Sequence, residues 1–165
     1  MNVLWNYLWP AFAAGLVVGL VAGLSGFPRR RRRNASLALG LAAAIGVAAL
    51  WHAPFGAANR LSNHIQRDVR DALVYYEMTQ VTGHVQRGPL TRRIELSGPA
   101  DDFQRSELAR LMGQIPGASV ATWSGERGMP LIAEGTAASL LGFLFGLLLA
   151  FLVELRRRHN AQWNW

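Results

Sequence analysis

The stretch FPRRRRRN, residues 27–34, decides the fold, because five consecutive arginines stand between two long uncharged runs. Residues 1–28 and residues 34–59 contain no Asp, Glu, Lys or Arg, and a third such run covers residues 135–153. Each run reaches the roughly 17–25 residues that a helix needs to cross a bilayer core. The pattern predicts three transmembrane helices.

Two arginine clusters set the expected orientation, because short arginine-rich loops stay on the cytoplasmic side of a membrane. Their members are Arg29, Arg30, Arg31, Arg32, Arg33, Arg156, Arg157 and Arg158. Three spans place both clusters inside at once. We therefore expect a bacterial inner-membrane protein whose N-terminus and middle segment are periplasmic and whose C-terminus is cytoplasmic. A cleaved signal peptide would begin with basic residues, whereas this chain begins uncharged, so the first run is interpreted as an uncleaved anchor.

The expected organisation follows from these limits. The segments are a first transmembrane helix over 1–28, an arginine loop over 29–33, a second transmembrane helix over 34–53, a periplasmic α+β domain over 57–128, a third transmembrane helix over 131–155 and a cytoplasmic tail over 156–165. Trp5, Trp9 and Trp51 fall near the expected outer interface, and Trp163 and Trp165 fall just beyond the inner one, as an aromatic belt would.

The net charge of +7 resembles that of a nucleic-acid-binding protein until it is divided along the chain. The clusters hold eight of the arginines, and the segment from Arg60 to Arg127 holds nine arginines against eight acids. A nucleic-acid surface needs basic residues spread over a folded face, so we expect no nucleic-acid partner. The chain has no cysteine, which excludes disulfides and thiolate chemistry.

Small residues recur every four positions in each apolar run, which places them along one helix face where two backbones can approach closely. The helix-packing candidates are Gly15, Gly19 and Gly23 in the first run, Ser36, Gly40, Ala44 and Ala48 in the second, and Ala138, Gly142, Gly146 and Ala150 in the third. One interpretation is that these stripes pack the three helices on each other. The other is that one stripe, that of the first helix, faces another protein or another copy.

The middle segment begins with a predicted helix over residues 59–76. Its expected apolar face consists of Leu61, Ile65, Val69, Leu73 and Tyr76, spaced three to four residues apart. The spacing then changes to two: residues 80–86 and 93–97 alternate as half-buried strands, with Gly88-Pro89 as the turn between them.

A second helix is expected after Asp101, which can cap it together with Gln104 in a capping box. The expected buried stripe of this helix is Phe103, Leu108, Leu111, Met112 and Ile115. Pro116-Gly117 ends the helix, and residues 118–123 are predicted to form a third strand. The order of elements is therefore αββαβ.

Within this segment, Leu96-Ser97-Gly98 and Pro116-Gly117-Ala118 resemble the BON domain, a small periplasmic module found in outer-membrane-protein-A-like bacterial proteins. The resemblance covers about residues 60–123. It implies a sheet with two helices on one face that binds phospholipid surfaces or other proteins without catalysis. BON domains often occur in tandem, whereas this segment is single and is tethered to a predicted membrane helix at each end.

Catalytic and metal-binding patterns are not apparent in the sequence. His52, His64, His84 and His159 are scattered and lack metal-ligand spacing. The acids Asp101 and Asp102 are interpreted as helix-capping residues. We therefore expect no enzyme activity, no cofactor and no small-molecule substrate.

The sequence leaves three hypotheses for function. The first is a non-catalytic scaffold or accessory subunit of a larger membrane complex, such as a respiratory or photosynthetic assembly, with other integral membrane proteins or a second copy as partners. The second is a stand-alone envelope-stress or phospholipid-binding protein. The third is a small self-assembling pore, which the absence of ionisable residues from the middle of the spans disfavours.

Overall fold

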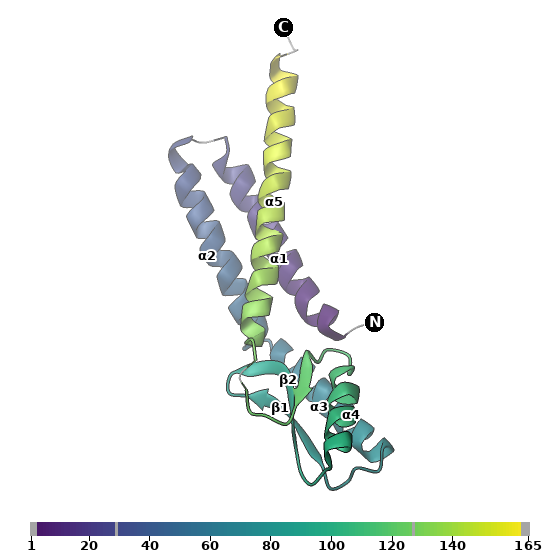
Figure 1. The fold of residues 1–165 in the computed structure, drawn as a ribbon. Coiled ribbons are helices and arrows are strands. Elements are labelled where there is room, and N and C mark those ends of the chain that lie inside the picture. Colours follow the sequence, from purple (N-terminus) through teal and green to yellow (C-terminus); the bar gives the residue numbers. More distant parts are fainter. Residues whose placement is uncertain (1–2, 29, 127, 163–165) are drawn as a thin grey trace. The chain divides into compact units, whose positions relative to one another are not determined.

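The computed structural model describes residues 3–28, 30–126 and 128–162, so Arg29, Trp163 and Trp165 lie outside the described residues. The elements in chain order are α1 (Val3–Gly26), η1 (Arg30–Arg32), α2 (Arg33–His52), α3 (Ala57–Tyr75), β1 (Thr82–Arg87), β2 (Leu90–Ser97), α4 (Asp102–Gly113), β3 (Val120–Thr122) and α5 (Leu131–Gln162) (Figure 1). Helices α1, α2 and α5 are long and apolar enough to cross a membrane. The predicted combination of three apolar helices with a small αββαβ segment is confirmed at this level.

The chain divides into two compact units. One consists of the residues up to Tyr7 together with Gly56–Ala133, and the other consists of Leu8–Phe55 and Glu134–Trp165. In the first unit, the buried hydroxyl of Tyr7 donates a 3.3 Å hydrogen bond to the carbonyl oxygen of Leu131. The start of α1 and the start of α5 therefore belong with the α+β segment, which the hydropathy pattern did not indicate.

In the helical unit, α1 and α5 run parallel and pack through glycine. A methyl group at Gly15 would overlap the carbonyl oxygen of Ser139, and one at Gly19 would overlap that of Phe143. From the other side, a methyl group at Gly142 would overlap the carbonyl oxygen of Phe12. Gly15 meets Ser139 and Gly19 meets Phe143, so the contacts advance in the same direction along both helices and the pair is parallel. Two backbones can approach this closely only where one of them lacks a side chain.

Helix α5 is longer than the sequence predicted. The expected third span ended at residue 155, whereas α5 continues through Arg156, Arg157 and Arg158 to Gln162. Glu154 pairs with Arg158 at 2.8 Å, four residues further along the helix, as expected for an ion pair on a helix surface. Arginine is also a good helix former, so the expected tail prolongs the helix as far as Gln162.

In the other unit, β2 is the central strand of a three-stranded sheet. It pairs antiparallel with β1 and parallel with β3. Val85, Ile94 and Ala121 lie side by side across the three strands and are all buried. Helix α3 packs against β1 and α4 packs against β3, and they cover this buried face (Figure 1). The alternate residues, such as Thr82 and His84, are exposed on the opposite face.

The segment after β3 folds back over the β1–β2 hairpin. The side-chain oxygen of Gln86 accepts hydrogen bonds from the hydroxyl of Thr91 and from the backbone N–H of Gly128, both at 3.1 Å. The guanidinium of Arg93 donates to the carbonyl oxygen of Glu126 at 2.7 Å. These bonds hold the chain against the sheet before it enters α5.

The capping box predicted for α4 is confirmed. The backbone N–H of Gln104 donates to the Asp101 carboxylate at 2.7 Å, and the backbone N–H of Asp101 donates to the Gln104 side chain at 3.0 Å. Two of the four otherwise unpaired N–H groups near the start of the helix are satisfied in this way.

Two predicted core residues are in fact exposed. Phe103 is 75% exposed, because it lies five positions before Leu108, a spacing that turns it well away from the face that buries Leu108 and Met112. Tyr76 is 44% exposed, because α3 ends at Tyr75 and the chain then leaves the helix through Glu77 at a positive φ of 56°.

Candidate interaction sites

The small-residue stripes of the three apolar helices meet one another inside the helical unit. Gly15 and Gly19 of the first stripe lie against α5, and Gly23 lies against Ala150. A methyl group at Gly146 would overlap the carbonyl oxygen of Leu16. The stripe of the first helix therefore faces α5 of the same chain and not the outside of the bundle.

The stripe of α2 faces both other helices. A methyl group at Gly40 would come 2.6 Å from the Cβ of Ala22 and 3.0 Å from the ring of Phe143. Ala44 and Ala48, which follow Gly40 by four and eight positions in α2, are also buried. In α5, Ser139 is fully buried, whereas the neighbouring Ala138, which the spacing predicted, is only partly buried. Ser139 donates a buried 2.8 Å hydrogen bond to the carbonyl oxygen of Ala44, a contact that small-residue spacing does not predict.

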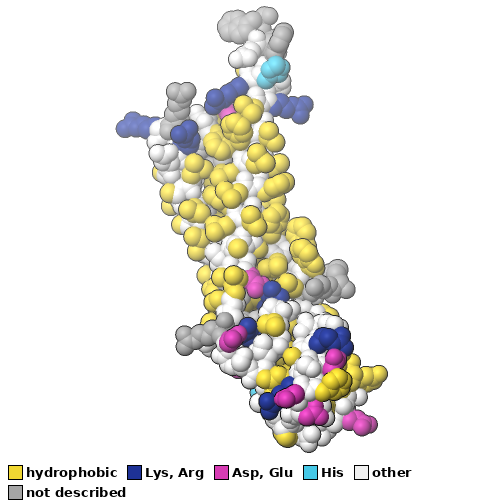
Figure 2. Space-filling view, in the orientation of Figure 1, with side chains coloured by type: hydrophobic (Ala, Val, Ile, Leu, Met, Phe, Trp, Pro, Cys, Tyr) yellow, Lys and Arg dark blue, Asp and Glu magenta, His cyan; other side chains and the backbone are white. Residues whose placement is uncertain are grey.

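The described arginines of both clusters lie at one end of the helical unit. Because α1 and α5 run parallel, the turn that follows α1 and the last turns of α5 come to the same end. Figure 2 shows the dark blue side chains gathered there, beyond the yellow apolar surface of the helices. Arg31, Arg32, Arg33, Arg156 and Arg157 are exposed. This arrangement accords with the expected common side for both clusters, while the membrane side itself stays a prediction.

The residues of the two BON-like motifs lie in the α+β unit and have structural roles there. Leu96 is a buried residue of β2, and Ser97 ends that strand. Gly98 has a φ of 133°, and a Cβ there would stand 2.5 Å from the carbonyl oxygen of Gln80. Pro116 is exposed, and Gly117 has a φ of 96° and lies against Leu61 and Ile65 of α3. A positive φ of this size favours glycine.

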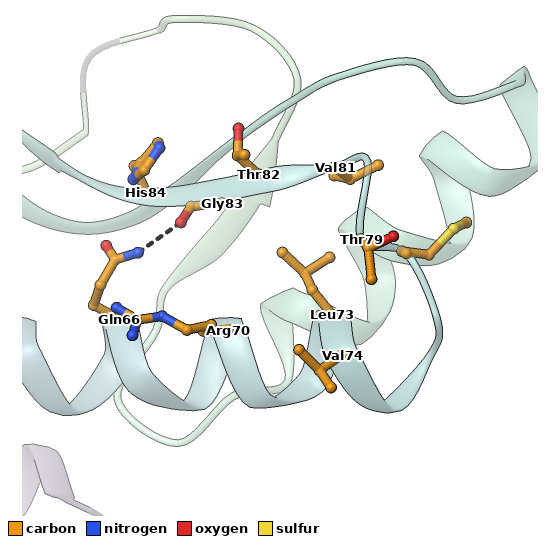
Figure 3. Close-up of a pocket in the computed structure, with 10 residues that line it drawn as sticks. Gln66, Arg70, Leu73, Val74, Thr79, Val81, Thr82, Gly83 and His84 are labelled. Carbon is orange, nitrogen blue, oxygen red and sulfur yellow. Dashed lines mark hydrogen bonds between the residues drawn. The ribbon is translucent and has the colours of Figure 1, made fainter.

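A groove of about 300 Å³ lies between α3 and β1 (Figure 3). Its apolar walls include Leu73, Val74 and Val81, and its polar residues include Gln66 and Arg70 of α3. Figure 3 shows that Thr82 and His84 lie on the side of β1 away from Gln66, so His84 does not converge with the polar residues of the helix. The groove therefore combines apolar walls with the polar side chains of Gln66 and Arg70 on its helix side.

Gln66 covers the open edge of β1. Its side-chain nitrogen donates to the carbonyl oxygen of Gly83 at 2.7 Å, and its side-chain oxygen accepts from the backbone N–H of Val85 at 3.0 Å. Gly83 permits this, because a Cβ there would come 2.5 Å from a methyl group of Val69 and would push α3 away. The edge of β1 is therefore closed to the addition of a further strand at Gly83 and Val85.

Next to the groove, the end of α3 exposes three consecutive large apolar or aromatic residues. Val74, which lines the groove, is 63% exposed, and Tyr75 is 80% exposed. The ring of Tyr76 packs edge-on against that of Tyr75 at 5.1 Å between centroids. We call Val74, Tyr75 and Tyr76 the α3 end patch. No periodicity signal identified it, because the sequence assigned Tyr76 to the core and left Val74 and Tyr75 unassigned.

Within residues 3–28, 30–126 and 128–162, no group of three or more His, Cys, Asp or Glu side chains is placed to hold a metal ion. His52, His64, His84 and His159 lie in α2, α3, β1 and α5, respectively. His64 pairs with Asp68 one turn along α3 at 3.4 Å, which is a surface contact.

Comparisons of the chain with protein-family models, curated proteins and solved structures found no match. The BON-like character of the α+β unit therefore stays a prediction, carried by Leu96-Ser97-Gly98 and Pro116-Gly117 alone. What the structure establishes is coarser: three helices that can cross a membrane and one small α+β unit with a groove and an exposed apolar patch.

Proposed function

We propose that this chain is a non-catalytic scaffold or accessory subunit of a larger membrane protein complex. Its three helices anchor one small α+β domain that binds a partner protein. The chain lies in the bacterial inner membrane, with the N-terminus and the α+β domain in the periplasm and the C-terminus in the cytoplasm. Respiratory and photosynthetic complexes are examples of assemblies that hold such subunits.

The observation that carries this proposal is the α3 end patch. Single exposed apolar residues are normal on protein surfaces, but a contiguous group beside a groove is typical of an interaction site. Here Val74 belongs to both the patch and the groove, and Tyr75 is 80% exposed although Leu73, two positions before it, is buried. Aromatic side chains of this kind supply much of the binding energy in protein interfaces.

The groove favours a particular partner chemistry. Leu73, Val74 and Val81 would hold an apolar side chain, and Arg70, exposed on α3, would meet an acidic one. Because Gln66 occupies the edge of β1, the partner would dock through side chains and not by adding a strand. We therefore expect a partner segment that combines an apolar anchor with a nearby carboxylate.

The test is purification of the full chain from native membranes in mild detergent through a tag after residue 165, read by native gel and mass spectrometry. We expect a defined, stoichiometric set of membrane subunits. Tyr75→Ser should lose that set, whereas Asn63→Ser, at an exposed position of the same helix outside the patch, should retain it.

A chain that purifies alone would contradict the proposal and favour the stand-alone envelope-stress or phospholipid-binding alternative. Retention of the same subunits by Tyr75→Ser would show that the partner docks elsewhere, and would remove the α3 end patch from the proposal. An absorbing cofactor that this chain retains after separation from the co-purified subunits would contradict the expectation that it binds none.

A further inference from the structure

A groove of about 390 Å³ runs between α1 and α2 on the outside of the helical unit. Val17 and Val21 of α1 and Leu39 of α2 form its rims and are 58%, 61% and 71% exposed. Gly40 and Ala43 lie on the α2 side, where no bulky side chain fills the space. We call this the α1–α2 groove.

A second hollow, of about 480 Å³, continues from it toward the arginine end of the unit. Val21 and Ser25 line both spaces, and the second is completed by Leu24, Pro28 and Arg157 of α5. We call it the Arg157 hollow. The two together form one path that is apolar at Val17 and cationic at Arg157.

The junction between the two spaces is polar. The hydroxyls of Ser25 and Ser36 stand 2.7 Å apart, and both approach the carbonyl oxygen of Ala22, at 3.1 Å and 2.9 Å. The path therefore changes from apolar to hydroxyl-lined and then to cationic over a short length. Val17 and Ser25 are eight residues apart, which corresponds to about 12 Å along a helix.

The charge at this end is strongly positive. Among the side chains that the structure describes there, Arg31, Arg32, Arg33, Arg156, Arg157 and Arg158 face a single acid, Glu154, which pairs with Arg158 at 2.8 Å. For Arg157, no ion pair is found within the described part of the chain. An anion would therefore meet an available guanidinium at the mouth of the hollow.

We propose that this path binds one anionic phospholipid of the surrounding bilayer. One acyl chain lies in the α1–α2 groove, the ester region lies beside Ser25, and the phosphate lies beside Arg157. The groove alone cannot select a lipid, because bulk lipid tails are as apolar as its walls. The selection comes from the headgroup, since an arginine that directly meets the lipid phosphate favours an anionic lipid by about fivefold.

The experiment is native mass spectrometry of the full chain in mild detergent, titrated with phosphatidylglycerol and, separately, with phosphatidylcholine of the same acyl chains. We expect the wild-type chain to hold one phosphatidylglycerol at least fivefold more tightly than phosphatidylcholine. Arg157→Gln should reduce that preference to twofold or less. Arg156→Gln removes the same charge from a residue that does not line the hollow, and should preserve the preference.

A second variant tests the apolar part of the path. Val21→Trp places a large side chain at an exposed position shared by both spaces, so it should weaken binding of both lipids without disturbing the buried helix contacts. Equal affinity for the two lipids in the wild-type chain would overturn the proposal. Equal losses in Arg157→Gln and Arg156→Gln would also overturn it, because they would indicate diffuse charge attraction. A second protein chain in place of the lipid adduct would show that the groove is a protein interface.

Discussion

The hydroxyl of Ser139 donates a 2.8 Å hydrogen bond to the carbonyl oxygen of Ala44, and both residues are fully buried among the three apolar helices. The bond ties α5 to α2 across 95 positions of sequence. Hydrogen bonds between membrane helices contribute about 0.5–2 kcal/mol each. Ser139→Ala should therefore lower the free energy of unfolding of the full chain by about this amount. Titration with sodium dodecyl sulfate in mixed micelles measures the change as a lower unfolding midpoint. A midpoint equal to that of the wild-type chain would contradict the role given to this bond.

The glycine contact between α1 and α5 should tolerate no side chain. Gly15→Ala would drive a methyl group into the carbonyl oxygen of Ser139, and forcing the helices apart should cost about 1–3 kcal/mol. Gly46→Ala is the matched control, because Gly46 lies in α2 with no atom within 4 Å of an added Cβ. That control should be neutral or slightly stabilising, since alanine favours helix over glycine. Equal midpoints for the two variants in the same micelle titration would refute the close approach.

Gly98 should be the most sensitive glycine of the α+β unit. Gly98→Ala places a Cβ 2.5 Å from the carbonyl oxygen of Gln80 at a φ of 133°, so we expect a loss of about 2–4 kcal/mol from strain and overlap together. Gly125→Ala, with nothing near the added atom, should change little. Thermal unfolding of the full chain in detergent, followed by circular dichroism, measures both. Similar melting temperatures for the two variants would contradict the expectation.

Gln66 should control the hydrogen exchange of the β1 edge. Gln66→Ala removes the acceptor of the Val85 N–H and the donor to the Gly83 carbonyl, so we expect faster exchange at Val85 and a stability loss of about 1–2 kcal/mol. Gln114→Ala, at an exposed position after α4, is the control. Hydrogen exchange read by mass spectrometry on peptides that cover β1 distinguishes the two. Unchanged protection of Val85 in Gln66→Ala would show that the side chain does not seal the edge.

Orientation can be tested with single cysteines, because the natural chain has none. Ser124→Cys and Asn160→Cys lie at exposed positions in the α+β unit and in the last turns of α5. If the arginine clusters are cytoplasmic, a membrane-impermeant maleimide should label Ser124→Cys in spheroplasts and should label Asn160→Cys only after lysis. The reverse pattern would invert the proposed orientation.

Much of the fold could be predicted because its signals are local. Uncharged runs of sufficient length report helices that suit a bilayer, whatever those helices pack against. The αββαβ order follows from residue spacing, and the capping box of Asp101 and Gln104 involves only neighbours along the chain. Tyr76 and Phe103 were wrongly assigned to the core. Tyr76 follows the last residue of α3, and Phe103 lies five positions before Leu108, off the face that α4 buries.

The candidate sites could be predicted only in part. Four-residue spacing identified which faces of the apolar helices were small, but not that the face of α1 would meet α5 of the same chain. Nothing in the local pattern singled out Gln66, Ser139 or the α3 end patch. Gln66 and Ser139 bond to residues of another element, and the α3 end patch is exposed because no other element that the structure describes covers it.

The sequence by itself determined the apolar helices, the two arginine clusters and the order of elements, because hydropathy and backbone preference act over a few residues. Only the tertiary structure decided that Gly15 lies against Ser139, that Gln66 seals β1 and that Val21 and Ser25 join a groove to Arg157. Those pairings join residues far apart in the chain. They are selected by the close packing of whole surfaces, which no short window of sequence contains.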